Sequence, residues 1–521
     1  MKFSSMHLVL AAGYMTRCAE ALGTFKLDFT RERRAVTHLG KRGKAFEVPL
    51  VESSLYLINV TVGSPPQTIS LNVDTGSSNT WFPSVDSNAC QAANGSCADG
   101  VAFDPNESSS LRYLSNGSFA VAYGTGQATG DYISDSVKIG PATINNLTLG
   151  LAANLSAPFA NGLLGMGYDS LETLAASSGI QFPGVLTRLK QAGVIARRAF
   201  SVYLDDQEAG VGSILFGGID TSKYTGDLVA VAITPNGTGV YDRYRVDLTA
   251  VSFLDSAGKS TLLSPAIMSA PCAVDTGASY NILPASISQA LVEGLGAVSY
   301  AGVYFVDCAL RDSNTSVLFQ FGGPGGPIIR VPISEMLGVP LGFTFNDGRN
   351  GCQLYVGQVD DAELQSLLLA GFTIGDPVIR SAYVVYDVDN NEIYLAQAAF
   401  NRTGKGKVQE IPAGSGLPSV TSTATATASS FPTSFPPSIL SEISVSLLSN
   451  QTASSPGLTA TTQLPTTPTS PSFDIAAITG SAATTTSTSS AAASRSSFDA
   501  GINTIAGAIV LLFMPWITLI L

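Results

Sequence analysis

The sequence predicts an all-β-dominated globular body built from two related halves. Residues 47–402 contain many short runs in which apolar and polar residues alternate, separated by turns rich in Gly, Pro and Asn, and this pattern is typical of strands that pack on one face. The hexapeptide Val-Asp-Thr-Gly-Ser-Ser at 73–78 recurs as Val-Asp-Thr-Gly-Ala-Ser at 274–279. Each half of the body therefore carries one copy of the same motif after an apolar strand.

Local patterns predict the individual elements. Residues 56–60 and 68–73 alternate in the manner of β-strands. Helical spacing of apolar residues stands out at only a few places, near 184–192, 287–295 and 361–369.

The composition restricts the kind of function. Of the 521 residues 45% are apolar and 13% are charged, with a formal net charge of −12. Nucleic-acid binding needs a basic face, so no nucleic-acid partner is expected, and the scarcity of basic groups limits charge repulsion in acid. The only histidines are His7 and His38. If that N-terminal region is removed, catalysis by Ser-His-Asp or Cys-His and histidine-ligated metal sites are excluded, and carboxylates remain as the main acid–base groups.

The N-terminus is expected to be processed. Residues 1–21 have a signal-peptide pattern, with Lys2, an apolar stretch and an Ala-Glu-Ala cleavage sequence at 19–21. Residues 22–42 are interpreted as a zymogen pro-segment that is cut after Lys41-Arg42. The alternative is that this basic stretch is a solvated, disordered linker.

The C-terminus predicts a stalk and a lipid anchor. Residues 404–494 are dominated by Ser, Thr, Ala and Pro, which cannot offset the entropy of ordering and indicate an extended, O-glycosylated stalk. Residues 495–521 combine a polar spacer with an apolar end and are interpreted as a removed glycosylphosphatidylinositol (GPI) anchor signal, with Ser490 and Ser494 as candidate attachment sites. The alternative is a transmembrane helix, although the apolar stretch at 505–521 is short for a span of about 20 residues.

Sequons and cysteines indicate a secreted glycoprotein. The six cysteines show no zinc-type spacing. Ten Asn-x-Ser/Thr sequons, a high density, predict N-glycosylation at Asn59, Asn94, Asn106, Asn116, Asn146, Asn154, Asn236, Asn314, Asn401 and Asn450.

The repeated motif can carry hydrolytic chemistry. Cleavage of a peptide bond without histidine or metal needs one group to activate water and one to protonate the leaving group. Two adjacent carboxyl groups that share a proton supply both roles. We therefore predict that Asp74 and Asp275 form a catalytic pair, with no metal and no cofactor. The alternative is that both motifs are structural turns, since Asp-Thr-Gly is a common turn composition.

These motifs resemble those of the pepsin family of aspartic proteases over about residues 50–400. Trp81 follows Asp74 by seven positions, Tyr-Gly-Thr-Gly at 123–126 resembles the family's flap hairpin, and further family motifs stand in order at 103–110, 162–167, 216–220 and 374–377. The resemblance implies a bilobal fold with the active-site cleft between an N-terminal lobe at 43–225 and a C-terminal lobe at 226–403.

The resemblance also implies roles for further residues. Substrate contacts are expected from Tyr123, Gly124, Thr125, Gly76, Gly277, Ala278 and Ser279. Disulfides are expected between Cys90 and Cys97 and between Cys308 and Cys352, and Cys272 is expected to be a buried thiol. Trp81 is expected to support the flap tyrosine.

Two departures from the family pattern carry information. Ala278 stands where many relatives have a hydroxyl that bonds the catalytic carboxylate, so the apparent pKa values of the pair are expected to be higher. In domain order the chain resembles the fungal yapsins, GPI-anchored aspartic proteases with Ser/Thr stalks. Their preference for basic substrate residues is not transferred, because Thr125 stands in the flap instead of an acid.

The leading prediction is a secreted, cell-surface aspartic endopeptidase that hydrolyses polypeptides as a monomer and is held at the outer face of the plasma membrane, or in the cell wall, by its lipid anchor. A binding or inhibitor protein that has lost catalysis is one alternative, but such proteins usually lack a motif aspartate or glycine, and this chain keeps both of each. A stalked structural glycoprotein is the other, and the large body with both motifs argues against it.

Overall fold

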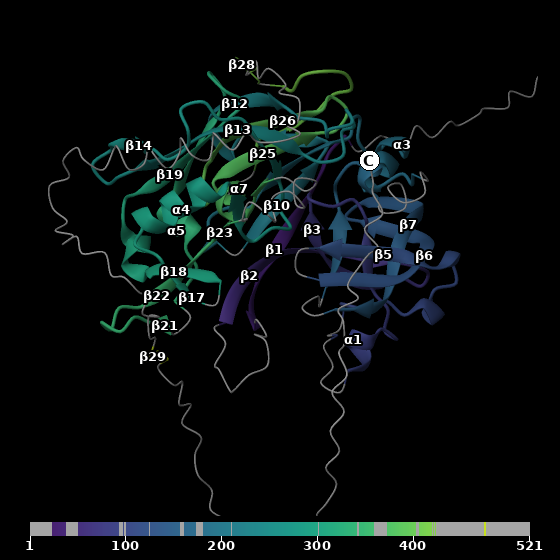
Figure 1. Cartoon of the computed structure of the whole chain (residues 1–521). Helices are drawn as coiled ribbons and strands as arrows, with labels where there is room; N and C mark the ends of the chain where they lie inside the picture. The colour runs from purple at the N-terminus through teal and green to yellow at the C-terminus, as the bar shows by residue number, and fades with distance from the viewer. Residues whose placement is uncertain are drawn as a thin grey trace, which may run out of the picture.

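The computed structural model describes residues 23–37, 50–92, 97, 100–123, 126–156, 161–172, 181–209, 211–300, 302–340, 343–358, 372–402, 406–418, 420, 422–423 and 474–475. The fold is mostly β, as predicted, and has two lobes with β1 and β2 running between them (Figure 1). The expected signal peptide, the helix at 361–369 and the anchor signal lie outside these residues. No helix in the described part of the chain is both long and apolar enough to cross a membrane.

A 14-stranded sheet extends through the first lobe and the lobe junction. Its first-lobe strands, in sheet order, are β2 (Leu50–Val62), β3 (Gln67–Asp74), β8 (Gly162–Gly165), β4 (Trp81–Pro83), β7 (Ala142–Leu155), β6 (Gly126–Ile139) and β5 (Arg112–Tyr123). Its junction strands are β28 (Ser422–Thr423), β12 (Tyr224–Ala232), β26 (Glu392–Ala398), β25 (Ala382–Asp387), β9 (Ala199–Tyr203), β10 (Val211–Phe216) and β1 (Phe25–Thr37). The lobe boundary expected between residues 225 and 226 falls inside β12.

The second lobe has its own eight-stranded sheet. It contains β20 (Ile328–Pro332), β19 (Ser316–Phe321), β13 (Arg245–Leu254), β15 (Ala270–Val274), β24 (Phe372–Ile374), β16 (Asn281–Leu283), β23 (Val356–Gln358) and β14 (Ser260–Leu262). Smaller sheets pair β17 (Val298–Tyr300), β18 (Val303–Asp307) and β22 (Gly351–Leu354), then β11 (Gly218–Asp220) with β27 (Val408–Glu410), and β21 (Phe343–Thr344) with β29 (Asp474–Ile475).

The described helices are short. They are α1 (Asn88–Gln91), α3 (Val185–Gln191), α4 (Ala285–Gly294), α5 (Ile333–Met336) and α7 (Asp376–Arg380), with 3-10 turns η1 (Pro105–Glu107), η2 (Asp169–Leu171) and η3 (Cys308–Asp312). Helices α3 and α4 confirm the expected helical stretches near 184–192 and 287–295. In α3 the apolar residues Val185, Leu186 and Leu189 are the buried ones.

Strand β1 shows that the basic N-terminal stretch is not a solvated linker over residues 25–37. It pairs antiparallel with both β10 and β2. Phe25 and Phe29 are buried in the core, and the buried Arg31 donates from Nη1 to the carbonyl of Gln207 at 2.5 Å. Alternation of Phe25, Leu27 and Phe29 is the pattern of a strand with one buried face.

One apolar core spans both lobes. It includes Val73 and Val274, which precede the two motifs, and the junction residues Phe200 and Tyr386, whose rings stack at a centroid distance of 4.7 Å. A close-packed core of this kind is hardly compressible. It therefore fixes the positions of the two motif loops relative to one another.

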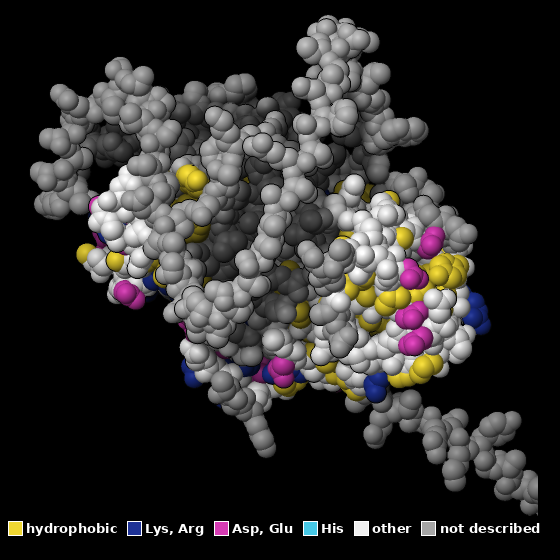
Figure 2. Space-filling view, turned by 90° about the horizontal axis from the view of Figure 1, so that it is seen from below, with side chains coloured by type: hydrophobic (Ala, Val, Ile, Leu, Met, Phe, Trp, Pro, Cys, Tyr) yellow, Lys and Arg dark blue, Asp and Glu magenta, His cyan; other side chains and the backbone are white. Residues whose placement is uncertain are grey.

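The face shown in Figure 2 carries a row of acidic side chains on its right-hand side and scattered basic side chains, among larger areas of uncharged described atoms. This agrees with a chain in which only 13% of residues are charged.

Candidate active site

Both Asp-Thr-Gly loops follow strands that are held in the same way. Strand β3 pairs parallel with β8, so that Asp74 lies opposite Gly165, and β15 pairs parallel with β24, so that Val274 lies opposite Ile374. The amide of Met166 donates to the carbonyl of Asp74 at 2.8 Å, and the amide of Asp275 donates to the carbonyl of Ile374 at 2.9 Å. The family motifs at 162–167 and 374–377 therefore hold the two Asp-Thr-Gly loops in place.

The two threonines lock the loops together across the lobe junction. The Oγ1 of Thr75 donates to the carbonyl of Val274 at 2.9 Å and accepts from the amide of Thr276 at 3.0 Å. In return, the Oγ1 of Thr276 donates to the carbonyl of Val73 at 2.8 Å and accepts from the amide of Thr75 at 3.2 Å. Both threonines are buried, so these four hydrogen bonds are shielded from water and fix the spacing of the loops.

The motif glycines leave room for the carboxyl groups. A Cβ atom on Gly76 would lie 2.2 Å from Oδ2 of Asp275, and one on Gly277 would lie 2.5 Å from Oδ1 of Asp74. Each glycine amide also donates to Oδ1 of the aspartate two positions before it, at 2.9 Å for Gly76 and 2.7 Å for Gly277. The structure thus brings the predicted pair together, and only glycine fits at these two positions.

The carboxyl group of Asp275 has a raised affinity for protons. Burial raises the pKa of Asp275 well above its usual value, and the negative charge of Asp74 and a hydrogen bond between the two carboxyl groups raise it further. The amide of Gly277 and the charge of Arg243 act in the opposite direction. Because two close carboxyl groups do not both ionise easily, Asp275 is the one that retains a proton.

The two motifs differ in one hydrogen bond to the aspartate. The Oγ of Ser77 donates to Oδ2 of Asp74. Ala278 holds the corresponding position in the second motif and has no hydroxyl, so no equivalent donor reaches Asp275 from there. The effect of the missing hydroxyl on the pKa of Asp275 stays a prediction, because the rise in that pKa is caused by burial and by Asp74. Ala278 and Ser279 are half-buried in the loop that follows Asp275.

The predicted flap tyrosine lies next to the first motif. Tyr123 ends β5 and is paired with Gly126, the first residue of β6; Gly124 and Thr125 lie outside the described residues. The Nε1 of Trp81 donates to the Tyr123 hydroxyl at 2.9 Å, and a hydrogen bond also joins the hydroxyls of Tyr123 and Ser77. Burial and the charge of Asp74 raise the pKa of Tyr123, so this phenol stays protonated.

The cysteines behave as the resemblance implied. Cys90 bonds to Cys97 and Cys308 bonds to Cys352. Cys272 is a buried free thiol whose Sγ donates to the carbonyl of Val246 at 3.3 Å. Burial raises the pKa of this thiol, which argues against a nucleophilic role.

Six of the sequon asparagines, Asn59, Asn106, Asn146, Asn154, Asn314 and Asn401, are exposed and Asn236 is half-buried. The side chain of Asn116 and the residues Asn94 and Asn450 lie outside the described part.

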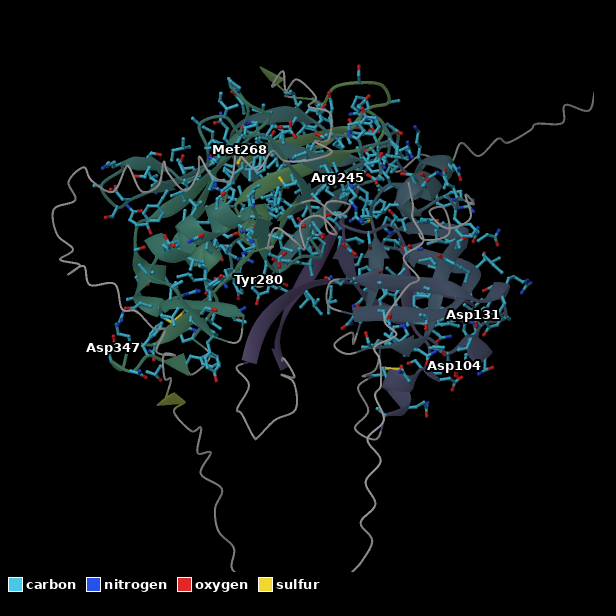
Figure 3. The ribbon with its side chains drawn as sticks, in the orientation of Figure 1. Asp104, Asp131, Arg245, Met268, Tyr280 and Asp347 are labelled. Carbon is cyan, nitrogen blue, oxygen red and sulfur yellow. A yellow bond between two sulfur atoms is a disulfide. The ribbon has the colours of Figure 1, made fainter. Side chains whose placement is uncertain are left out.

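Two residues near the site were missed by sequence reasoning. Tyr386 of β25 lies behind the threonines, and its hydroxyl donates to the carbonyl of Val274 at 3.4 Å. Arg243 lies just before β13, and its Nη1 donates to the carbonyl of Gly76 at 3.3 Å; Arg245, two residues later, lies at the lobe junction in Figure 3. Both residues reach the site only through tertiary packing, and no local motif distinguishes them.

A pair of carboxyl groups that shares a proton between two β-lobes defines the class of an aspartic peptidase. The sequence profile of the eukaryotic aspartyl protease family matches residues 55–398. The chain belongs to this family, the pepsin-like aspartic endopeptidases.

Known proteins agree with this assignment. "Probable aspartic-type endopeptidase opsB" of Aspergillus oryzae is 36% identical over 392 residues, covering 74% of this chain and 77% of its own length. "Aspartic proteinase yapsin-3" of Saccharomyces cerevisiae is 30% identical over 419 residues, covering 76% and 78%. The solved aspartic proteinase from Irpex lacteus has the same fold, with a TM-score of 0.52 at 24% identity, over 67% of this chain and 96% of that one.

Proposed function

We propose that this chain is a secreted aspartic endopeptidase in which Asp74 and Asp275 are the catalytic residues. The observation that carries the proposal is the contact of the two carboxyl groups, each lying where the opposite motif has glycine. The raised pKa of Asp275 supports a division of labour between the two groups.

In this mechanism the ionised Asp74 removes a proton from a water molecule as the water attacks the scissile carbonyl carbon. Asp275 gives its proton to the carbonyl oxygen to form a tetrahedral intermediate. As the carbon–nitrogen bond breaks, Asp74 passes the proton that it took from water to the amide nitrogen, and a hydroxyl of the intermediate returns a proton to Asp275. One carboxylate and one carboxylic acid are needed at the start, which is the protonation state that the geometry favours. The donors Ser77 and Gly76 stabilise the charge on Asp74.

Residues around the pair are proposed to hold the substrate. Gly76, Gly277, Ala278 and Ser279 form the loops beside the carboxyl groups, and Tyr123 with Gly124 and Thr125 forms the flap. The hydrogen bond from Trp81 orients the Tyr123 hydroxyl. Because burial keeps this hydroxyl protonated, Tyr123 is proposed to cover the substrate as an uncharged side chain.

An assay of the purified protein on acid-denatured globin tests the activity, from about pH 3 to pH 7 with and without pepstatin. We expect cleavage in acid that pepstatin abolishes. A folded protein that cleaves nothing over this range, or cleaves equally well with pepstatin, contradicts the proposal.

We further propose that the protein is displayed at the cell surface as a monomer held by a GPI anchor. The stalk at 404–494, the anchor signal at 495–521 and the small residues Ser490 and Ser494 support this, as does the similarity to yapsin-3 and to "Secreted aspartic protease 1" of Candida albicans. The exposed sequons suit N-glycosylation of a secreted chain.

Treatment of intact cells with a phosphatidylinositol-specific phospholipase tests the anchor, provided that the anchor lipid is cleavable. The enzyme should be released into the medium. Mass spectrometry that finds Leu521 in the mature membrane-bound protein would rule the anchor out and favour a transmembrane helix.

Processing at the N-terminus is proposed to occur after residue 21 and after Lys41-Arg42. The pairing of β1 with β10 and β2 implies that a cut after Arg42 leaves residues 25–37 attached to the sheet through hydrogen bonds and the burial of Phe25 and Phe29. N-terminal sequencing of the native protein measures both cuts. A single mature chain that begins before Arg31 would contradict the second cut.

A further inference from the structure

A cationic side chain lies beside the carboxyl pair and has no role in the mechanism above. Arg243 enters the site from the segment that precedes β13, and its Nη1 donates to the carbonyl of Gly76 at 3.3 Å. Gly76 is itself packed against the carboxyl group of Asp275. The guanidinium of Arg243 therefore bridges from the second lobe to the first motif, next to the groups that cleave the bond.

The neighbouring acid, Asp242, already has an ion-pair partner and a hydrogen-bond donor. Asp242 binds Arg245, with 2.5 Å between Oδ1 and Nη1, and accepts a hydrogen bond from Nδ2 of Asn236 at 3.1 Å. Among the described residues no carboxylate lies within ion-pair distance of Arg243. The charge of Arg243 is thus not committed to a structural ion pair in this part of the chain.

Arg243 also has unused hydrogen-bonding capacity. A guanidinium carries five N–H donors, and its Nε is buried with no acceptor among the described residues. A substrate cannot reach the buried Nε, but the side chain is half-buried as a whole, and its Nη2 is neither buried nor hydrogen-bonded among the described residues, so a substrate can reach that end of the guanidinium. An unsatisfied cationic donor at the edge of a site favours a planar anion that accepts two hydrogen bonds, and a carboxylate has that shape.

We propose that Arg243 is a specificity-determining residue that binds an Asp or Glu side chain of the polypeptide substrate. The inference rests on the proposed peptidase function and names a preference at the same site. An extended chain advances by about 3.3–3.6 Å per residue, and Arg243 contacts the motif next to the scissile bond. The preferred acid therefore lies within about three residues of that bond. This preference is opposite in charge to the basic-residue preference of the yapsins that the domain order resembles.

The charges around Arg243 are consistent with this role. Burial is the main factor that lowers its pKa, and Arg245 lowers it further, whereas Asp242, Asp275 and Asp74 raise it. Arginine nonetheless remains protonated in proteins. Arg243 is therefore charged over the acidic range. Of the two groups in the proposed ion pair, only the substrate carboxylate titrates there, with a pKa of about 4.

Pairs of internally quenched peptides that differ only by Glu or Gln at one position test the proposal. At about pH 5, where a free Glu side chain is largely ionised, the wild-type enzyme should cleave the Glu peptide about tenfold faster in kcat/KM at one position near the scissile bond. Arg243→Gln should bring that ratio to about one, and Arg243→Lys should retain part of it because it keeps the charge. Arg112→Gln, an exposed arginine in β5, is the matched control and should not change the ratio.

The outcomes separate this inference from the proposed function. If the wild-type enzyme cleaves the peptides with a Glu/Gln ratio near one at every position, the inference is wrong and the peptidase stands. If Arg243→Gln is folded by its thermal transition and keeps the wild-type ratio, the inference is also wrong. If Arg243→Gln does not fold, Arg243→Lys decides the question, because an undiminished ratio in that variant would contradict planar recognition by the guanidinium. If no peptide or protein is cleaved, the proposed function itself fails.

Discussion

Replacing Ala278 by Ser adds to the second motif the hydroxyl that Ser77 provides in the first. Ser77 donates to Oδ2 of Asp74, and we expect the new serine to donate to Asp275 in the same way. A donor to the ionised form of a carboxyl group lowers its pKa. The change therefore opposes the burial and the Asp74 charge that raise the pKa of Asp275.

The size of the shift follows from the strength of the hydrogen bond. A hydrogen bond to an ionised group contributes about 1.5–3 kcal/mol, and one pKa unit corresponds to about 1.4 kcal/mol. The higher apparent pKa of the pair should therefore fall by about one to two units. Because activity requires Asp275 to hold its proton, the alkaline limb of the kcat/KM profile should move to lower pH by that amount.

A pH–rate profile of Ala278→Ser against the wild type measures this shift. Ser77→Ala is the matched control and removes a donor from Asp74, so it should move the acid limb to higher pH. If the alkaline limb of a folded Ala278→Ser enzyme stays in place or moves upward, the explanation for the asymmetry of the pair is wrong.

Three further perturbations have defined outcomes. Both oxygens of Asp376 are buried and have no hydrogen-bond partner among the described residues, and burial raises the pKa of this carboxyl group to about 7. The folded state then binds more protons than the unfolded state between about pH 4 and pH 7, so the free energy of unfolding falls as the pH rises through that window. Asp376→Asn should flatten this fall by up to a few kcal/mol in urea titrations at several pH values, and an unchanged slope would contradict the burial argument. Thr276→Val removes a hydrogen bond to Val73 and leaves the Thr75 amide unpaired; it should lower the free energy of unfolding by about 1–3 kcal/mol and also lower kcat, and a fully active variant would show that the threonine lock is dispensable. Trp81→Phe removes the donor to Tyr123 and should lower kcat/KM about fivefold; equal activity at a pH where the variant is folded would argue against orientation of the flap by Trp81.

Much of the site could be predicted from the sequence because its determinants are local. Each Asp-Thr-Gly motif follows an apolar strand, and the glycines are required by the close approach of the opposite carboxyl group. The cysteine pairings were also predicted correctly, although they came from the family resemblance rather than from the spacing alone.

The remaining features depend on packing that no local pattern shows. The basic residues of 31–34 favoured a linker or pro-segment, and the pairing of β1 with β10 and β2 is seen only in the structure. Arg243 carries no motif and becomes part of the site only because the second lobe brings it onto the Gly76 carbonyl. The burial of Asp376 likewise depends on helix α7 lying against the junction.

The most direct test of the account is the peptidase activity of Asp74→Asn and Asp275→Asn measured beside their thermal unfolding. Both substitutions keep the size and shape of the side chain but remove the carboxyl group that shares the proton. No other described carboxyl group is in place to take over this role. We expect each variant to fold and to lose essentially all cleavage of acid-denatured globin. Near-wild-type activity in either folded variant would contradict the two-carboxyl mechanism.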